Sequence, residues 1–165
     1  MRSSSRYLGF GLAATLMVAG ITGGHAQSTD KKADLVLVKD GEPQCSIVVS
    51  NKPSRMAVLA AAELQWHIEQ ITGAKVPVVR ETEEIKGLPI YIGESPKVRE
   101  LGLKNNAFAD REFAVAFFPD ALVLTGRADD WEKAPDGPLN LEIKPFDMSG
   151  NRGPLFATYE FIENF

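Results

Sequence analysis

The segment Asp129-Asp130-Trp131 has the side chains best suited to bind a sugar. The flat face of an exposed tryptophan can stack on a sugar ring, while neighbouring carboxylates accept hydrogen bonds from its hydroxyl groups. These residues lie near the start of a polar stretch, residues 128–154, which is long for a loop and therefore hints at a functional or inserted segment. The alternative is that Trp131 folds back on the domain as a loop plug.

Paired carboxylates are a second source of chemistry. Glycoside hydrolysis requires two carboxyl groups about 5 to 10 Å apart across the sugar. Three pairs are close in sequence: Glu83 with Glu84, Asp129 with Asp130, and Glu160 with Glu163. Adjacent acids in polar loops are typical of solvated surface, so no pair is assigned as catalytic. A complete small hydrolase that uses the second or third pair is the last-ranked hypothesis.

The sequence assigns no catalytic, cofactor-binding or metal-binding residue. It lacks the motifs His-Glu-x-x-His, Gly-x-Ser-x-Gly, Gly-x-x-x-x-Gly-Lys and Cys-x-x-Cys. His67 is the only histidine after residue 26, and no catalytic partner for it is evident. Cys45 is the only cysteine and lies in an apolar, strand-like run, so we expect a buried and unreactive thiol.

Residues 1–26 have the organisation of a secretory signal peptide. Arg2 and Arg6 form a positive start, and residues 7–21 are uncharged and mostly apolar. This apolar run is shorter than the roughly 20 residues that a bilayer span needs. Small residues precede the predicted cut after Ala26, which indicates a secreted or periplasmic product. Retention of the segment as an N-terminal anchor is the alternative.

The composition excludes several classes of protein. The chain has 165 residues, of which 44% are hydrophobic and 24% are charged, as in an ordinary soluble globular domain. Its formal net charge is -4, so no basic excess attracts nucleic acid or an anionic membrane surface. We therefore expect no nucleic-acid partner, and no membrane association after signal cleavage.

Residues 27–33 are polar and are expected to form a flexible leader. Hydrophobic patterning predicts one clear helix, over residues 53–72. Pro53 and Ser54 favour its start, and Gly73 favours its end. Its apolar stripe consists of Met56, Ala60, Leu64, Ile68 and Ile71. The other predicted elements are a hairpin of 35–38 and 45–49, strands at 76–79 and 88–92, a short helix at 95–101, a second hairpin of 112–118 and 121–125, and a helix from 155.

Four motifs follow one another along residues 34–165. They are AAAELQ at 60–65 with ITG at 71–73 and VPV at 76–78; IYIGES at 90–95; EF at 112–113 with LVLTGR at 122–127; and RGPLFATYEFIE at 152–163. In this order, they resemble the small N-terminal domain that precedes the catalytic barrel in family 67 alpha-glucuronidases and family 20 beta-hexosaminidases. The resemblance is greatest to related secreted bacterial proteins of unknown activity that carry this domain.

The resemblance implies an α+β fold, in which a mixed β-sheet is covered by helices in two layers, as in domain 2 of the beta-hexosaminidases. It implies an accessory domain over 34–153 and, over 154–165, the start of a helix that leads towards a catalytic barrel. Pro154 and Phe156 depart from the family pattern, which affects only the local geometry of this entry. The families' catalytic acids lie in the barrel, which needs at least about 200 residues, so none transfers to this chain.

The sequence therefore predicts a non-catalytic accessory domain of a secreted glycoside hydrolase, which supports the active site of a C-terminal glycosidase barrel. The aromatic run at 155–165 ends without a cap, so we expect either a shortened chain or a partner that covers this end. The alternative is a free-standing extracytoplasmic module that binds a polysaccharide, an oligosaccharide or a protein. In that case Trp131, Asp129 and Asp130 would contact the sugar. Because fold likeness does not fix function, the hydrolase assignment is an analogy.

Overall fold

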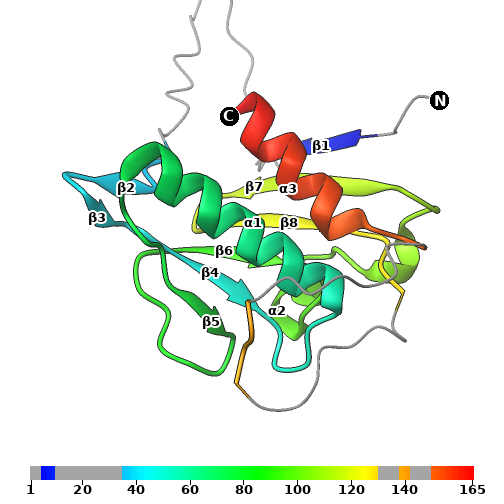
Figure 1. Ribbon diagram of the computed structural model, residues 1–165. Helices are drawn as coiled ribbons and strands as arrows, with labels where there is room; N and C mark the ends of the chain where they lie inside the picture. The colour runs from blue at the N-terminus through cyan, green and yellow to red at the C-terminus, as the bar shows by residue number, and fades with distance from the viewer. Residues whose placement is uncertain (1–4, 10–34, 130–137, 142–149) are drawn as a thin grey trace, which may run out of the picture.

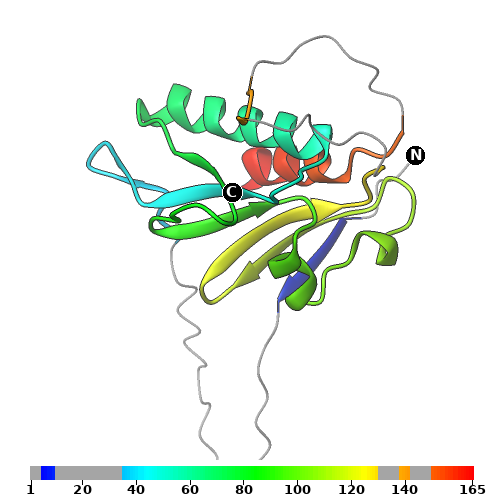
Figure 2. The ribbon, with the colours of Figure 1, turned by 90° about the horizontal axis from the view of Figure 1, so that it is seen from below.

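The computed structural model describes residues 35–129, 138–141 and 150–165, together with the backbone of residues 5–9. A mixed β-sheet carries two long helices, α1 (Arg55–Thr72) and α3 (Gly153–Asn164), side by side on one face (Figure 1). The short helix α2 (Pro96–Glu100) lies on the opposite face (Figure 2). The predicted α+β class, with a mixed sheet covered by helices, is therefore confirmed.

The main sheet has the strand order β1-β7-β8-β6-β4-β5 (Figure 1). Strands β5, β4, β6 and β8 run parallel to one another, whereas β7 runs antiparallel to β8 and parallel to β1. The carboxyl ends of the four parallel strands β5, β4, β6 and β8 therefore lie at one edge of the sheet. The strands are β1 (Ser5–Gly9), β4 (Cys45–Val49), β5 (Val78–Arg80), β6 (Leu88–Ile92), β7 (Phe113–Phe118) and β8 (Ala121–Gly126).

Helix α1 ends at Thr72, as predicted, but it begins at Arg55, two residues after the predicted start, because Ser54 is its N-cap and Pro53 lies before it. The Oγ atom of Ser54 accepts a hydrogen bond from the Ala57 N–H at 3.1 Å, and Gly73 ends the helix in the left-handed conformation with φ 73°. The apolar stripe is buried as far as Ile68. The expectation for Ile71 is wrong, because its side chain is 77% exposed and lines an open groove instead of the core.

Both faces of the central strands are buried, and each face has its own hydrophobic core. Ile47, Ile90 and Leu122 point towards α1 and α3, whereas Val48 and Val123 pack with α2 on the other face. Continuous apolar runs are typical of strands that are covered on both sides. The same holds for β7, in which Phe113 and Val115 belong to one core and Ala114 and Ala116 belong to the other.

The second predicted hairpin is confirmed, because β7 and β8 pair on either side of Pro119 and Asp120. The first is only partly correct. The hairpin around Asp40 and Gly41 joins β2 (Val38–Lys39) to β3 (Glu42–Pro43). Cys45–Val49 instead pairs with β5 and β6 at the centre of the main sheet, where its backbone groups are engaged on both sides.

Two smaller boundaries also differ from expectation. Strand β5 starts at Val78, directly after Pro77, because proline has no N–H to donate to a ladder. Helix α3 starts earlier than predicted, at Gly153, with Pro154 in its first turn, where a missing N–H costs nothing.

Candidate functional site

The carboxyl edge of the parallel strands is the first place to look for a site. In open α/β sheets, ligands bind outside the carboxyl ends of the strands, where connections diverge to opposite sides. Here β4 is followed by a connection to β5 on one side, and its other neighbour β6 leads on towards β8. Glu94 and Ser95 follow β6, and Arg127 follows β8. This edge is therefore polar.

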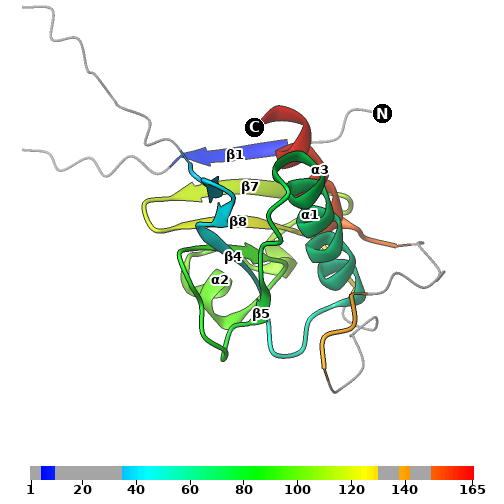
Figure 3. The ribbon, with the colours of Figure 1, turned by 60° about the vertical axis from the view of Figure 1, so that its left-hand side comes forward.

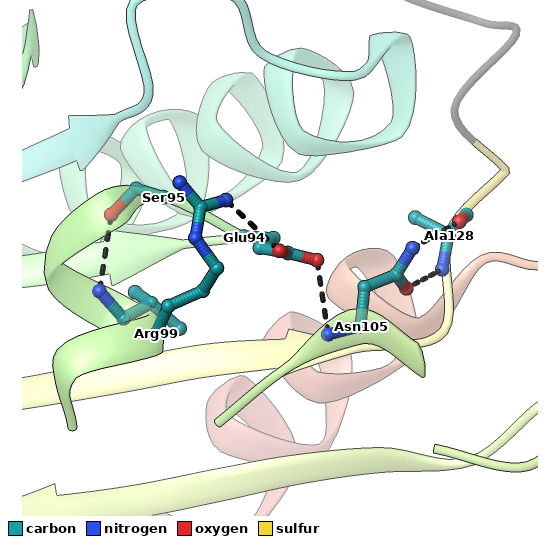
Figure 4. Close-up of polar contacts among 6 residues, drawn as sticks. Glu94, Ser95, Arg99, Asn105 and Ala128 are labelled. Carbon is teal, nitrogen blue, oxygen red and sulfur yellow. Dashed lines mark hydrogen bonds and ion pairs between the residues drawn. The ribbon is translucent and has the colours of Figure 1, made fainter. Parts of the chain in front are cut away.

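Glu94 is held by two donors at this edge (Figure 4). The Nη1 atom of Arg99 donates to Oε1 at 3.0 Å, and the Asn105 N–H donates to Oε2 at 2.9 Å. Ser95 caps α2, since its Oγ accepts from the Val98 N–H at 3.2 Å. Because both oxygens of Glu94 are engaged, the carboxylate orders the connection after β6, and it is not poised as a free general base.

Asn105 extends this network to the end of β8 (Figure 4). Its Nδ2 atom donates to the Ala128 carbonyl at 2.8 Å, and its Oδ1 atom accepts from the Ala128 N–H at 2.8 Å. The side chain thus satisfies both backbone groups of one residue, as a neighbouring strand would. Ala128 also forms an isolated antiparallel bridge with Arg152. These contacts fix the exit from β8 against the entry to α3.

Asp129 is the one member of the proposed sugar-binding trio that the structure describes. Its Oδ2 atom accepts from the Asn151 N–H at 2.9 Å, and its Oδ1 atom accepts from Asn151 Nδ2 at 3.1 Å. These bonds hold the pKa of Asp129 below its usual value. The carboxylate therefore already has protein partners. Asp130 and Trp131 lie outside the described residues, so sugar contact by the trio stays a prediction.

Protonation of Asp129 is expected to loosen its bond to Asn151. Because the folded-state pKa is lowered, the carboxylate stabilises the fold above about pH 4, the pKa in an unfolded chain, and this stabilisation is lost as the pH falls through the folded pKa. We expect Asn151→Ala, which removes the Nδ2 donor but keeps the main-chain N–H, to reduce part of the loss of unfolding free energy below about pH 4. Urea unfolding at a series of pH values measures this, with the exposed Asn164→Ala as control. Identical profiles for Asn151→Ala and wild type would contradict it.

The other two acid pairs lie in a turn after β5 and on helix α3. Glu83 accepts from the Arg80 N–H at 2.8 Å and closes a turn, while the exposed Glu84 lies 3.6 Å from Lys86. Glu163 is exposed on α3, and Glu160 is half-buried on the same helix. Within the described residues, no group of three His, Cys, Asp or Glu side chains is placed to hold a metal ion.

His67 and Cys45 have ordinary structural surroundings. The Nδ1 atom of His67 lies 2.8 Å from the Glu63 carbonyl, one turn earlier in α1. The Sγ atom of Cys45 donates to the Leu37 carbonyl at 3.4 Å, and burial raises the pKa of this thiol to about 11. The prediction that Cys45 is buried is confirmed. At neutral pH such a thiol is not ionised, and only the thiolate is an effective nucleophile.

An apolar groove of about 780 Å³ lies at the other end of the helices. It is formed by residues 35–37, the last turns of α1 and α3, and the turn between β7 and β8. Its side chains include Leu35, Val36, Leu64, Ile71, Phe117 and Phe165. Ile71 is 77% exposed and Phe165 is 57% exposed. Large contiguous apolar surfaces on soluble proteins commonly mark an interaction site.

Sequence reasoning anticipated only the α3 side of this groove. The aromatic run of α3 indicated an uncovered end, but the parts contributed by Leu35, Val36 and Ile71 were missed. The one available signal was Ile71, the final apolar residue of the α1 stripe. It lies in the last turn of the helix, where packing against the sheet constrains a side chain least. Residues 35–37 line the groove because of tertiary packing against distant parts of the chain. No local sequence pattern predicts such a contact.

Comparisons with protein-family models, with curated proteins and with solved structures find no match to this chain. Among the residues that the structure describes, no helix has the length and apolar character needed to cross a membrane.

Proposed function

We propose that this chain is the non-catalytic N-terminal accessory domain of a secreted glycoside hydrolase, related to alpha-glucuronidases and beta-hexosaminidases. Its role is to pack against the catalytic barrel and support the barrel's active site. The observation that carries the proposal is the apolar groove, because its rim includes large side chains such as Ile71 and Phe165 that are mostly exposed. A buried interface of this kind favours apolar and aromatic anchors.

The position of the groove supports a barrel as the partner. Helix α3 contributes Phe161 and Ile162 to the groove, and Phe165, which follows the helix as its C-cap, also lines it. A catalytic domain joined after residue 165 would therefore start at the groove rim, without a long connection. The four family-like motifs also fall on consecutive elements of one domain: α1 with β5, β6 with α2, the β7–β8 hairpin, and α3.

Binding of an environment-sensitive apolar dye tests whether the groove is open. The folded chain should bind the dye, and the double variant Ile71→Gln with Phe165→Ser should bind it severalfold more weakly, because both side chains lie on the rim. Trp66→Gln is the matched control, since Trp66 is 55% exposed on α1 but does not line the groove. Dye binding should be unchanged in this control.

Two results would count against the proposal. A folded chain that binds no dye has no open apolar groove available to a barrel. Saturable glycan binding that Trp131→Ala abolishes would instead support the free-standing carbohydrate-binding module.

A further inference from the structure

Among the described residues that line the apolar groove, His67 has the only titratable side chain. The other polar side chain of the lining, Thr72, is engaged at the end of α1. Its Oγ1 atom donates to the Ile68 carbonyl at 2.7 Å and accepts from the Ala74 N–H at 3.1 Å. Histidine is the side chain whose charge ordinarily changes between pH 5 and 8. His67 is therefore the described lining residue that can place a charge in the groove near neutral pH.

The hydrogen bond of His67 determines where its second proton binds. The Nδ1 atom lies 2.8 Å from the Glu63 carbonyl oxygen, one turn earlier in α1. Because a carbonyl oxygen can only accept, Nδ1 carries the hydrogen of the neutral ring, and Nε2 is unprotonated. Protonation of the ring therefore adds the proton at Nε2. The side chain is 29% exposed, so water reaches the ring while the groove is open.

Glu63 is the charged partner of His67 in the described structure. Its Oε2 atom lies 3.9 Å from Nδ1, on the same helix. On α3, which lies beside α1 (Figure 3), Tyr159 is hydrogen-bonded to this carboxylate. The described residues that other elements contribute to the lining, namely 35–37, Leu88 and those of the β7–β8 turn, are apolar. Glu63 can therefore stabilise a protonated ring from the Nδ1 side, but no described side chain that lines the groove carries a negative charge.

We propose that protonation of His67 opposes docking of an apolar partner surface in the groove. This regulation rests on the proposed function, in which a surface of the barrel covers the groove. Water solvates a charged ring in the open groove, and a docked apolar surface displaces that water. A charged group that loses its water without gaining a partner raises the free energy of the complex. Docking is therefore tighter at neutral pH than at acid pH, and by linkage a docked partner disfavours protonation.

Titration of the full chain with Nile red, an uncharged environment-sensitive dye, tests this regulation at about pH 7.5 and about pH 5.5. The dye represents an apolar partner and carries no charge that could attract or repel the ring. The dissociation constant of the wild type should rise at least about threefold at the lower pH. His67→Gln is polar but uncharged, so it should bind the dye equally well at both pH values.

Glu69→Gln is the matched control for His67→Gln. It removes an ionisable group from α1 that does not line the groove, so it should keep the pH response of the wild type. Circular dichroism of each sample verifies that the chain is folded at both pH values.

The possible results separate this regulation from the proposed function. Equal dye binding by the wild type at both pH values would overturn the regulation and leave the open groove intact. Weaker binding at the lower pH that persists in His67→Gln would also overturn it, because another group would then cause the response. A folded chain that binds no dye at either pH value would overturn both proposals.

Discussion

Gly153→Ala is expected to lower the free energy of unfolding by about 3 kcal/mol, at the upper end of the range for overpacking. A Cβ atom at this position would lie 2.5 Å from the Arg127 nitrogen and 2.6 Å from the Gly126 Cα. Both are backbone atoms, so no flexible side chain can move aside. The Gly153 N–H also donates to the Arg127 carbonyl at 2.8 Å, and this bond fixes α3 against the end of β8.

Gly102→Ala is the matched control for this experiment. Gly102 has a φ of +86°, but no atom lies within 4 Å of a Cβ built there. Its substitution should therefore cost only the left-handed strain of about 1–2 kcal/mol. Urea unfolding of both variants measures the difference. If Gly153→Ala were no more destabilising than Gly102→Ala, the close approach of α3 to β8 would be contradicted.

Phe161→Ala is expected to cost about 3–5 kcal/mol of unfolding free energy, as typical for removing a buried phenylalanine. Phe161 is 5% exposed, belongs to the core between the sheet and the two long helices, and stacks with Phe165 at a centroid distance of 5.9 Å. The deletion would enlarge the groove into the core. The loss should appear as a lower urea midpoint with an unchanged slope.

Ile71→Ala shows whether side chains on the groove rim contribute to stability as the buried Phe161 does. Because Ile71 is mostly exposed, its truncation should change the unfolding free energy by no more than about 0.5 kcal/mol. Comparable losses in Phe161→Ala and Ile71→Ala would mean that the rim is part of the packed core. The groove would then not be an available interface.

Local signals in the sequence were sufficient for most elements. Ser54 and Gly73 have the chemistry of a helix start and a helix end, and in the structure they are the N-cap and the C-cap of α1. Pro119 with Asp120 marks the turn between β7 and β8. Each of these signals acts within a few residues, so a single sequence is enough to read it.

Pairing between distant strands could not be predicted in the same way. Cys45–Val49 lies between β5 and β6, which follow it in the chain after α1. An apolar run of this length is compatible with a hairpin strand and with a buried parallel strand. Tertiary packing decides between them, which explains why Cys45–Val49 was wrongly assigned to the first hairpin.

The candidate sites were predictable only in part for the same reason. The acid–tryptophan segment was visible in the sequence, but the commitment of Asp129 to Asn151 depends on a contact across the loop base. The groove combines Leu35 with Ile71 and Phe165, which are far apart in the chain. No local periodicity brings such residues together.

The intact mass of the secreted product in its source cell tests the central proposal most directly. If the chain is the accessory domain of a larger glycoside hydrolase, the product should begin at residue 27 and extend several hundred residues beyond Phe165. The barrel alone requires at least about 200 residues. A secreted product that ends at Phe165 would contradict the proposal, since no barrel would be available for the groove to contact.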